Sequence, residues 1–332
     1  MTSSSLDHAM FGLFSTHALH LADKHGVFTH LIAEGPATPA RIATARRIDE
    51  ETLERLLLVL ASVSVVERGS DGSYRIAQAL TPFFDTAGPR YIGGFVRHLV
   101  TNTTGQLERL DDYLTRGKAV VDAGLPAPFD TIYRDEEATR EFLEAMWNLS
   151  FGVSEELVEL ARLDGVRHLV DVGGASGAFA VAALTRYPSL NVTVFDLPEV
   201  GPFLENTRQS KGLQDRLAFA PGDFFRDPLP PAECLSFGYI LSDWDDKTCV
   251  ELLRKAYDAC ASGGRVLLME RLFDENGGPL ATAAMNLSMH VETQGRHRTA
   301  AEYTGLLEEA GFGDCAAHRS TWDKHLVVGR KS

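Results

Sequence analysis

The feature of this sequence that most constrains its fold is the alternation of strand-like and helix-like segments from residue 166 to the C-terminus. The strand-like segments are short apolar runs, and segments with helical spacing of apolar residues separate them. Strands that alternate with helices predict a parallel, doubly wound α/β sheet that binds ligands at the carboxyl ends of its strands. The strand-like segments are 166–174, 191–198, 217–225, 234–241, 263–272 and 325–330.

The first hundred residues show a different order, in which helices precede a hairpin. Apolar residues follow helical spacing in 8–30, and Thr38, which precedes a proline, and Asp49 are typical helix starts. Asp71, which precedes a glycine between two β-prone runs, predicts a hairpin turn. This order is typical of a winged helix, a fold that often binds DNA.

The charge of the chain argues against DNA as a partner. Its 332 residues include 46 acidic and 32 basic side chains, a formal net charge of −14, whereas DNA and anionic lipid both require a basic face. No apolar run approaches the roughly 20 residues that span a bilayer, and the N-terminus lacks the pattern of a secretion signal. The four cysteines show no CxxC spacing, which is typical of free thiols in a reducing compartment. We therefore expect a soluble, cytoplasmic protein without a nucleic-acid or membrane partner.

Acidic residues end three successive predicted strands, at Asp171, Asp196 and Asp223. Asp171 precedes the loop Gly-Gly-Ala-Ser-Gly, whose glycines allow a sharp turn and a close approach to a ligand. An acid at this place suits a cationic amino group, the second acid suits a ribose diol, and the third suits an adenine amino group beside Phe224. Ammonium, ribose and adenine together describe S-adenosylmethionine. The residues expected to bind it are Asp171, Gly173, Gly174, Gly177, Asp196, Leu197, Asp223, Phe224 and Ser242.

Five motifs with a specific order and spacing extend the argument to nearly the whole chain. They are DVGGASG, FDLP, GDFF, SDWDDKTCVELLRKAYDACASGG and GRHRTAAEYTGLLEEAGF. With them the chain resembles the two-domain, S-adenosylmethionine-dependent O-methyltransferases of plants and bacteria, which act on small molecules. The resemblance implies a class I methyltransferase fold, which is a Rossmann-like doubly wound α/β sheet. It also implies an N-terminal, helical, winged-helix-like dimerisation domain that forms a homodimer.

The resemblance suggests how the chain is divided. We expect the dimerisation domain in 1–100, a helical linker that forms a wall of the acceptor pocket in 101–163, and the methyltransferase domain in 164–332. A loop rich in proline and glycine is expected at 122–130. On the linker, Met146 and Trp147 match a family position beside the cofactor and the acceptor, although their helical spacing fits a plain core position equally well.

The sequence departs from this family at the residue that should remove the proton of the acceptor. In the family a Leu-His-Asp-Trp segment carries the general base, but here Ser242 replaces its histidine, and a serine cannot take that role unaided. The family also places a supporting glutamate where this chain has His297, whereas a second supporting acid is retained as Glu270. Gly238 stands where some members carry a basic residue near the carboxylate of the cofactor.

Histidines near the lost base suggest a metal site. Asp243, His290 and His297, with Glu292 or Glu270 nearby, offer the mixed nitrogen and oxygen ligands of zinc or iron. A metal would stabilise the enolate of an α-keto acid. We therefore favour metal-assisted C-methylation of the β-carbon, by the logic of bacterial α-keto acid C-methyltransferases of antibiotic pathways. The expected catalytic residues are Asp243, Glu270, His290 and His297, and the expected acceptor contacts are Met146, Trp147 and Glu292.

Other interpretations remain open at this point. The chain could methylate a phenol or another hydroxyl with His297 as a displaced base. It could also bind S-adenosylmethionine without catalysis, or act as a winged-helix regulator.

Overall fold

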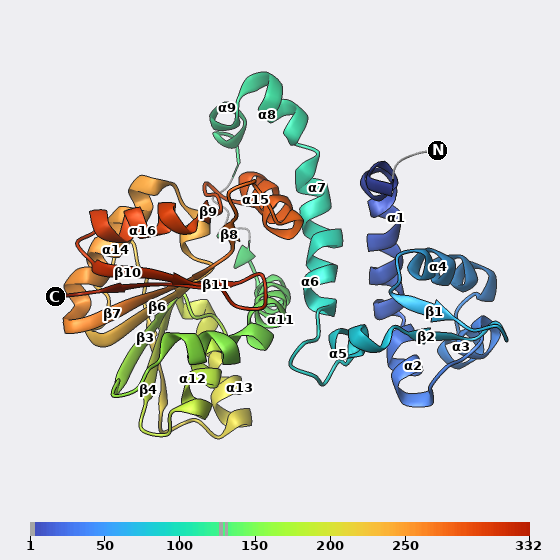
Figure 1. Cartoon of the computed structure of the whole chain (residues 1–332), viewed down its shortest axis with the longest axis horizontal. Helices are drawn as coiled ribbons and strands as arrows, with labels where there is room; N and C mark the ends of the chain where they lie inside the picture. Colours follow the sequence, from blue (N-terminus) through green and yellow to red (C-terminus); the bar gives the residue numbers. More distant parts are fainter. Residues whose placement is uncertain (1–3, 126–128, 130–131) are drawn as a thin grey trace. The chain divides into compact units, whose positions relative to one another are not determined.

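The computed structural model describes residues 4–125, 129 and 132–332, and the chain divides into two compact units, 1–104 and 105–332 (Figure 1). Of the loop expected at 122–130, residues 126–128 and 130 lie outside the described residues. Within the described residues, no helix is both long enough and apolar enough to cross a membrane.

The N-terminal unit has the helical, winged-helix-like order that the sequence predicts. The side chain of Asp49 accepts a hydrogen bond from the backbone N–H of Thr52 at 2.8 Å and starts a helix, as predicted. Phe28 and Phe84 stack at 4.0 Å between ring centroids in the core of the unit. Its elements are α1 (Ser4–Lys24), α2 (Val27–Glu34), α3 (Pro39–Arg46), α4 (Glu50–Ser62), β1 (Val66–Arg68), β2 (Tyr74–Ile76), η1 (Gln78–Leu80), α5 (Thr81–Phe84), α6 (Gly93–His98) and η2 (Leu99–Thr103).

The C-terminal unit is built on a seven-stranded sheet with the order β10-β11-β7-β6-β3-β4-β5. Strands β3 to β7 are parallel, whereas β11 runs antiparallel to β7 and β10 antiparallel to β11. This arrangement confirms the doubly wound α/β sheet. The strands are β3 (His168–Val172), β4 (Asn191–Asp196), β5 (Leu217–Pro221), β6 (Ala232–Gly238), β7 (Cys260–Glu270), β10 (Gly313–His318) and β11 (His325–Arg330), and a separate parallel pair is β8 (Leu272–Phe273) with β9 (Arg298–Thr299).

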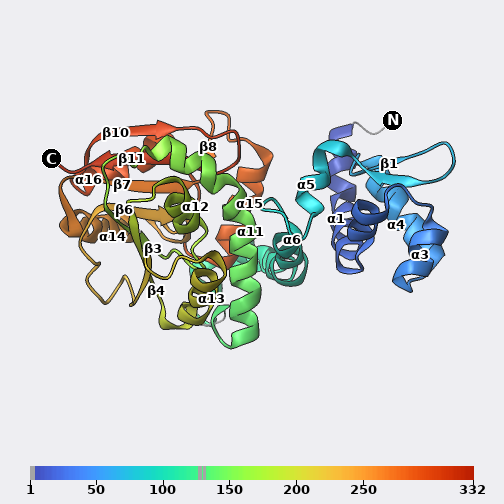
Figure 2. The ribbon, with the colours of Figure 1, turned by 90° about the horizontal axis from the view of Figure 1, so that it is seen from below.

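Helices cover both faces of the sheet (Figure 2). Alternate strand residues point to opposite faces, so that Leu169 packs with α11, α12 and α13, and Val170 packs with α14 and α16. The two apolar layers leave the carboxyl edge of the parallel strands for polar residues. The helices of this unit are α7 (Thr104–Leu107), α8 (Leu110–Arg116), α9 (Lys118–Asp122), α11 (Glu136–Ala161), α12 (Ala178–Arg186), η3 (Pro198–Val200), α13 (Gly201–Lys211), η4 (Leu241–Asp243), α14 (Asp246–Ala259), α15 (Leu280–Glu292) and α16 (Ala300–Glu309).

Candidate active site

The glycine loop after β3 folds closely over Asp171. The backbone φ angles of Gly173 and Gly177 are 65° and 85°, in the left-handed region that favours glycine. A Cβ atom on Gly174 would lie 2.6 Å from Oδ2 of Asp171, so a side chain would close the space over the carboxyl group. Asp171 is buried, and its Oδ1 accepts a hydrogen bond from the hydroxyl of Ser236 on β6 at 2.6 Å. Burial raises the pKa of Asp171 to about 6.

Asp196 joins the end of β4 to the same loop. Its Oδ2 accepts a hydrogen bond from the backbone N–H of Ala175 at 2.8 Å, and its Oδ1 accepts one from that of Leu197 at 2.7 Å. Burial raises the pKa of Asp196 to about 6. Each carboxylate oxygen keeps a second lone pair, which can accept a hydrogen bond from a hydroxyl group of a ligand.

Asp223 lies in the turn that follows β5. Its Oδ1 accepts a hydrogen bond from the backbone N–H of Phe225 at 2.8 Å, and its Oδ2 lies 3.4 Å from Nε of Arg226. The turn is also fixed by Lys255, which donates hydrogen bonds to the backbone carbonyls of Phe224 and Asp227. Because Asp223 is partly exposed, its carboxylate remains available to a ligand.

A group of aromatic rings lies beside this turn. The ring of Trp244 stands edge-on to those of Phe225 and Phe224, at 4.6 and 6.4 Å between centroids, and it stacks on Phe129 at 5.7 Å. Of these rings, the sequence analysis singled out only Phe224. Trp244 lies in the Asp-Trp segment, but its distance along the chain from the GDFF motif gave no sign that the rings meet.

Trp147 on α11 packs against the core and stacks on Phe151 at 4.4 Å between centroids. Met146, its neighbour, is half-buried. Trp147 is partly buried, so this packing is compatible both with a core position and with a contact to the acceptor.

The segment that replaces the family's base is held by Glu270, at the end of β7. Oε1 of Glu270 accepts hydrogen bonds from the backbone N–H groups of Leu241 and Ser242, at 3.0 and 3.4 Å. Glu270 is fully buried, and burial raises its pKa to about 7. The next residue, Asp243, has a pKa raised well above its usual value, first by burial and then by the charges of Glu270 and Glu292. The charges of Glu270 and Glu292 therefore both act on Asp243, the residue that follows Ser242.

The two histidines do not join this group. The ring of His290 stands edge-on to that of Tyr113, at 5.6 Å between centroids. His297 is buried, and neither of its ring nitrogens has a hydrogen-bond partner among the described residues. Burial, then the charges of Arg271 and Arg298, lower the pKa of His297 to about 3.

These surroundings do not support the expectation of a zinc or iron site. In the parts of the chain that the structure describes, no group of three histidine, cysteine, aspartate or glutamate side chains could hold a metal ion. The guanidinium groups of Arg271 and Arg298 repel a cation beside His297, and Asp243 lies with other carboxyl groups instead. The residues Asp243, His290 and His297 therefore do not fit a metal.

Arg298, which the sequence analysis did not select, fixes the loop that carries His297. Arg298 is fully buried. Its Nε and Nη2 donate hydrogen bonds to Oδ1 of Asp246 at 2.8 and 2.7 Å. Its guanidinium group also donates hydrogen bonds to the backbone carbonyls of Leu241 and Trp244, at 2.8 Å each. Arg298 thus connects this loop to the start of α14 and to the turn of Asp243. The only sequence signal for this structural role is the position of Arg298 directly after His297 in the motif GRHRTAAEYTGLLEEAGF.

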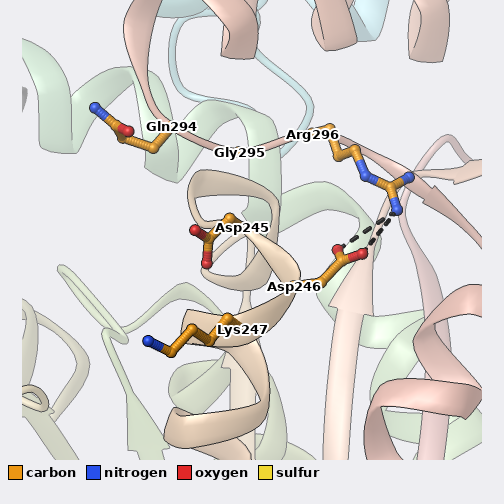
Figure 3. Close-up of a pocket in the computed structure, with 6 residues that line it drawn as sticks. All are labelled: Asp245, Asp246, Lys247, Gln294, Gly295 and Arg296. Atoms are coloured by element: carbon orange, nitrogen blue, oxygen red, sulfur yellow. Dashed lines mark hydrogen bonds and ion pairs between the residues drawn. The ribbon is translucent and has the colours of Figure 1, made fainter. Parts of the chain in front are cut away.

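Figure 3 shows the outer side of the same loop, where Arg296 reaches Asp246 at 3.2 Å. A pocket of about 300 Å³ lies there. It contains none of the residues expected from the sequence to bind a cofactor or an acceptor, and the Arg296–Asp246 pair closes one side of it. Its lining residues are Asp245, Asp246, Lys247, Gln294, Gly295 and Arg296.

A fold with paired acids and a glycine loop at the carboxyl ends of its strands defines the class of nucleotide-dependent α/β enzymes. Comparison with known proteins identifies the family. Residues 109–313 match the family model of the O-methyltransferase domain, and residues 7–81 match that of the O-methyltransferase dimerisation domain. The chain therefore belongs to the S-adenosylmethionine-dependent O-methyltransferase family, and the resemblance seen in the sequence is confirmed.

Individual relatives cover almost the full length of the chain. Human acetylserotonin O-methyltransferase is 31% identical and covers 96% of this chain and 95% of its own. The 3-hydroxy-5-methyl-1-naphthoate 3-O-methyltransferase of Streptomyces sahachiroi is 32% identical, over 97% of this chain and 93% of its own. Among solved structures, the human N-acetylserotonin methyltransferase in complex with S-adenosylmethionine is similar with a TM-score of 0.88, at 30% identity and full coverage of both chains.

Proposed function

We propose that this enzyme transfers the methyl group of S-adenosylmethionine to a hydroxyl oxygen of a small molecule and that Asp243 accepts the proton of that hydroxyl. The observation that carries this proposal is the position of Asp243 directly after Ser242, in a turn whose backbone N–H groups are held by Glu270, with the charges of Glu270 and Glu292 acting on its carboxyl group. Two relatives are named for O-methylation, of acetylserotonin and of a hydroxynaphthoate. This supports a hydroxyl group as the acceptor.

The cofactor residues form a site for a cation with a ribose. Asp171 and Asp196 are buried carboxyl groups with raised pKa values, and a bound positive charge would favour their ionised forms. The carboxyl group of Asp171, against which Gly174 packs without a side chain, suits the ammonium group of the cofactor, and Asp196 suits its ribose. Asp223 and the rings of Phe224 and Trp244 suit the adenine. The cofactor supplies the methyl group, and these residues orient it.

Asp243 is a better proton acceptor than His297. A general base works best when its pKa lies near the operating pH. Burial, and then the charges of Glu270 and Glu292, raise the pKa of Asp243 well above its usual value, whereas burial and two guanidinium groups lower the pKa of His297 to about 3. O-methylation therefore proceeds without the histidine base of the family and without His297 in its place.

Metal-assisted C-methylation of an α-keto acid finds less support. C-methylation of an α-keto acid passes through an enolate, and the enolate oxygen needs a positive charge beside it. Among the described residues, no group of three histidine, cysteine, aspartate or glutamate side chains could hold a metal ion. The ring of His290 stands edge-on to that of Tyr113, and the charges of Arg271 and Arg298 act on His297.

The substitution Asp243→Asn tests the proposed base. We expect kcat to fall by about 10²–10⁴-fold, the usual contribution of a general base, with the Kd for S-adenosylmethionine unchanged within about twofold. Asp243→Glu should retain part of the activity. Asp215→Asn, at an exposed aspartate in the turn before β5, is the matched control. An Asp243→Asn enzyme that keeps its kcat would exclude Asp243 as the base.

A further inference from the structure

Lys324 is a buried lysine at the carboxyl edge of the sheet. It directly precedes β11, whose first residue, His325, pairs with Glu270 at the end of β7. Its exposed fraction is only 4%, although lysine is rarely buried without a partner. Lys324 lies outside the motifs that indicate the cofactor site in the sequence.

The ammonium group of Lys324 occupies space that Gly238 leaves free. A Cβ atom on Gly238 would lie 3.1 Å from Nζ of Lys324. The ammonium group lies 4.0 Å from the centroid of the Tyr239 ring and donates a hydrogen bond to Oγ of Ser150 on α11 at 3.1 Å. Lys324, which directly precedes β11, thus places a positive charge at the end of β6, where Gly238 has no side chain.

The hydrogen-bonding capacity of Lys324 is only partly used. An ammonium group has three N–H donors, and the hydrogen bond to Ser150 is the one that the described residues accept from it. Glu270 and Asp171 act on Lys324 through their charges, but neither accepts a hydrogen bond from it among the described residues. Oε1 of Glu270 accepts hydrogen bonds from the backbone N–H groups of Leu241 and Ser242, and its buried Oε2 has no hydrogen-bond partner there. Two N–H donors of Lys324 therefore remain for an anionic group of a ligand.

Asp171 provides a negative charge that acts on the ammonium group of Lys324. The charges of Asp171 and Glu270 both act on Lys324, against the effect of burial, which lowers the pKa of Lys324 to about 8. The amino-acid end of S-adenosylmethionine carries one ammonium and one carboxylate group. A site with Asp171 and Lys324 offers opposite charges for both.

We propose that Lys324 binds the carboxylate group of the cofactor and thereby makes the site selective for the complete amino-acid end of S-adenosylmethionine. This inference rests on the proposed function, since it requires that S-adenosylmethionine binds at Asp171. The lysine reaches the site from β11 because Gly238 gives it room.

Binding measurements with two ligands test this role. Titration calorimetry would compare S-adenosylmethionine with its decarboxylated form, which keeps the sulfonium, ribose, adenine and ammonium groups. We expect the wild-type protein to bind S-adenosylmethionine at least about tenfold more tightly. In Lys324→Met we expect the affinity for S-adenosylmethionine to fall at least about tenfold and that for the decarboxylated form to change less than twofold. Equal losses for both ligands, or no loss for either, would overturn the proposal.

Two further variants keep the test decisive if Lys324→Met does not fold. Ser150→Ala removes the hydrogen-bond acceptor of the ammonium group, so S-adenosylmethionine should bind a few-fold more weakly and the decarboxylated form unchanged. Lys324→Arg keeps the positive charge and should keep the preference for S-adenosylmethionine. If the Ser150→Ala protein loses affinity for both ligands equally, Lys324 has only a structural role.

The outcomes also separate this inference from the proposed function. If the wild-type protein binds neither S-adenosylmethionine nor its demethylated product, the proposed function itself fails. If it binds both and prefers neither the complete nor the decarboxylated cofactor, only the role of Lys324 is wrong.

Discussion

Burial raises the pKa of Asp243, which lies in the turn after β6, and the charge of Glu270 at the end of β7 raises it further. The same Glu270 accepts hydrogen bonds from the backbone of that turn. One carboxyl group therefore both positions the segment and favours a higher pKa of its aspartate. In the proposed mechanism, Asp243 acts as the base in place of the family's histidine.

The pH dependence of methylation should reflect the pair of Asp243 and Glu270. Because the charge of Glu270 raises the pKa of Asp243, the fall of kcat on the acid side should begin above the usual pH range of an aspartate. Glu270→Gln removes the charge and keeps the shape, so the acid limb of the pH–kcat profile should move to lower pH. An acid limb that stays in place in this variant would show that Glu270 does not tune the base.

Binding of S-adenosylmethionine should release protons near pH 6. Burial raises the pKa values of Asp171 and Asp196 to about 6 each, so both are partly protonated there without ligand. A bound cation lowers these pKa values, so protons leave and affinity rises as the pH increases from about 5 to 7. Titration calorimetry at pH 6 in two buffers with different ionisation enthalpies measures the released protons. Asp171→Asn should release fewer, and a wild-type protein that releases none contradicts the assignment.

Arg298 should contribute more to stability than its neighbour Arg296. Arg298→Met removes the guanidinium donor from the carbonyls of Leu241 and Trp244 and from Asp246, which should lower the free energy of unfolding by about 2–4 kcal/mol. Arg296→Met is the matched control, because this side chain is 43% exposed and pairs with the same Asp246, so we expect at most about 1 kcal/mol. Urea unfolding gives both values. Equal effects of the two substitutions would refute the role of Arg298.

The N-terminal unit should mediate a homodimer. The chain carries the dimerisation domain of its family, and Phe11 and Phe14 on α1 are 52% and 60% exposed in the single chain. Replacing both with glutamate should convert the dimer to a species of 36.3 kDa in light scattering. Leu114→Glu, at another exposed apolar residue, should leave the dimer intact. A wild-type protein that is already monomeric at micromolar concentration would contradict this prediction.

The strand pattern and the glycine loop were sufficient to predict the fold, and they place the expected cofactor site at the carboxyl edge of the sheet. Asp171 and Asp196 end neighbouring parallel strands, so their proximity follows from the topology that the sequence indicates. The sequence could not show whether the expected metal site exists. The spacing of residues along the chain does not reveal that the charges of Arg271 and Arg298 act on His297. Lys324 was missed for a related reason, since the residues around it come from four separate segments of the chain.

The identity of the methylated atom is the central claim and has a direct test. The protein is incubated with S-adenosylmethionine labelled with ¹³C in its methyl group, a panel of phenols and α-keto acids, and a strong chelator of divalent metals. We predict that the label appears as a methoxy carbon in the NMR spectrum of a phenol product and that the chelator leaves the rate unchanged. A label bound to the β-carbon of a keto acid, formed only when metal is restored, would contradict this account.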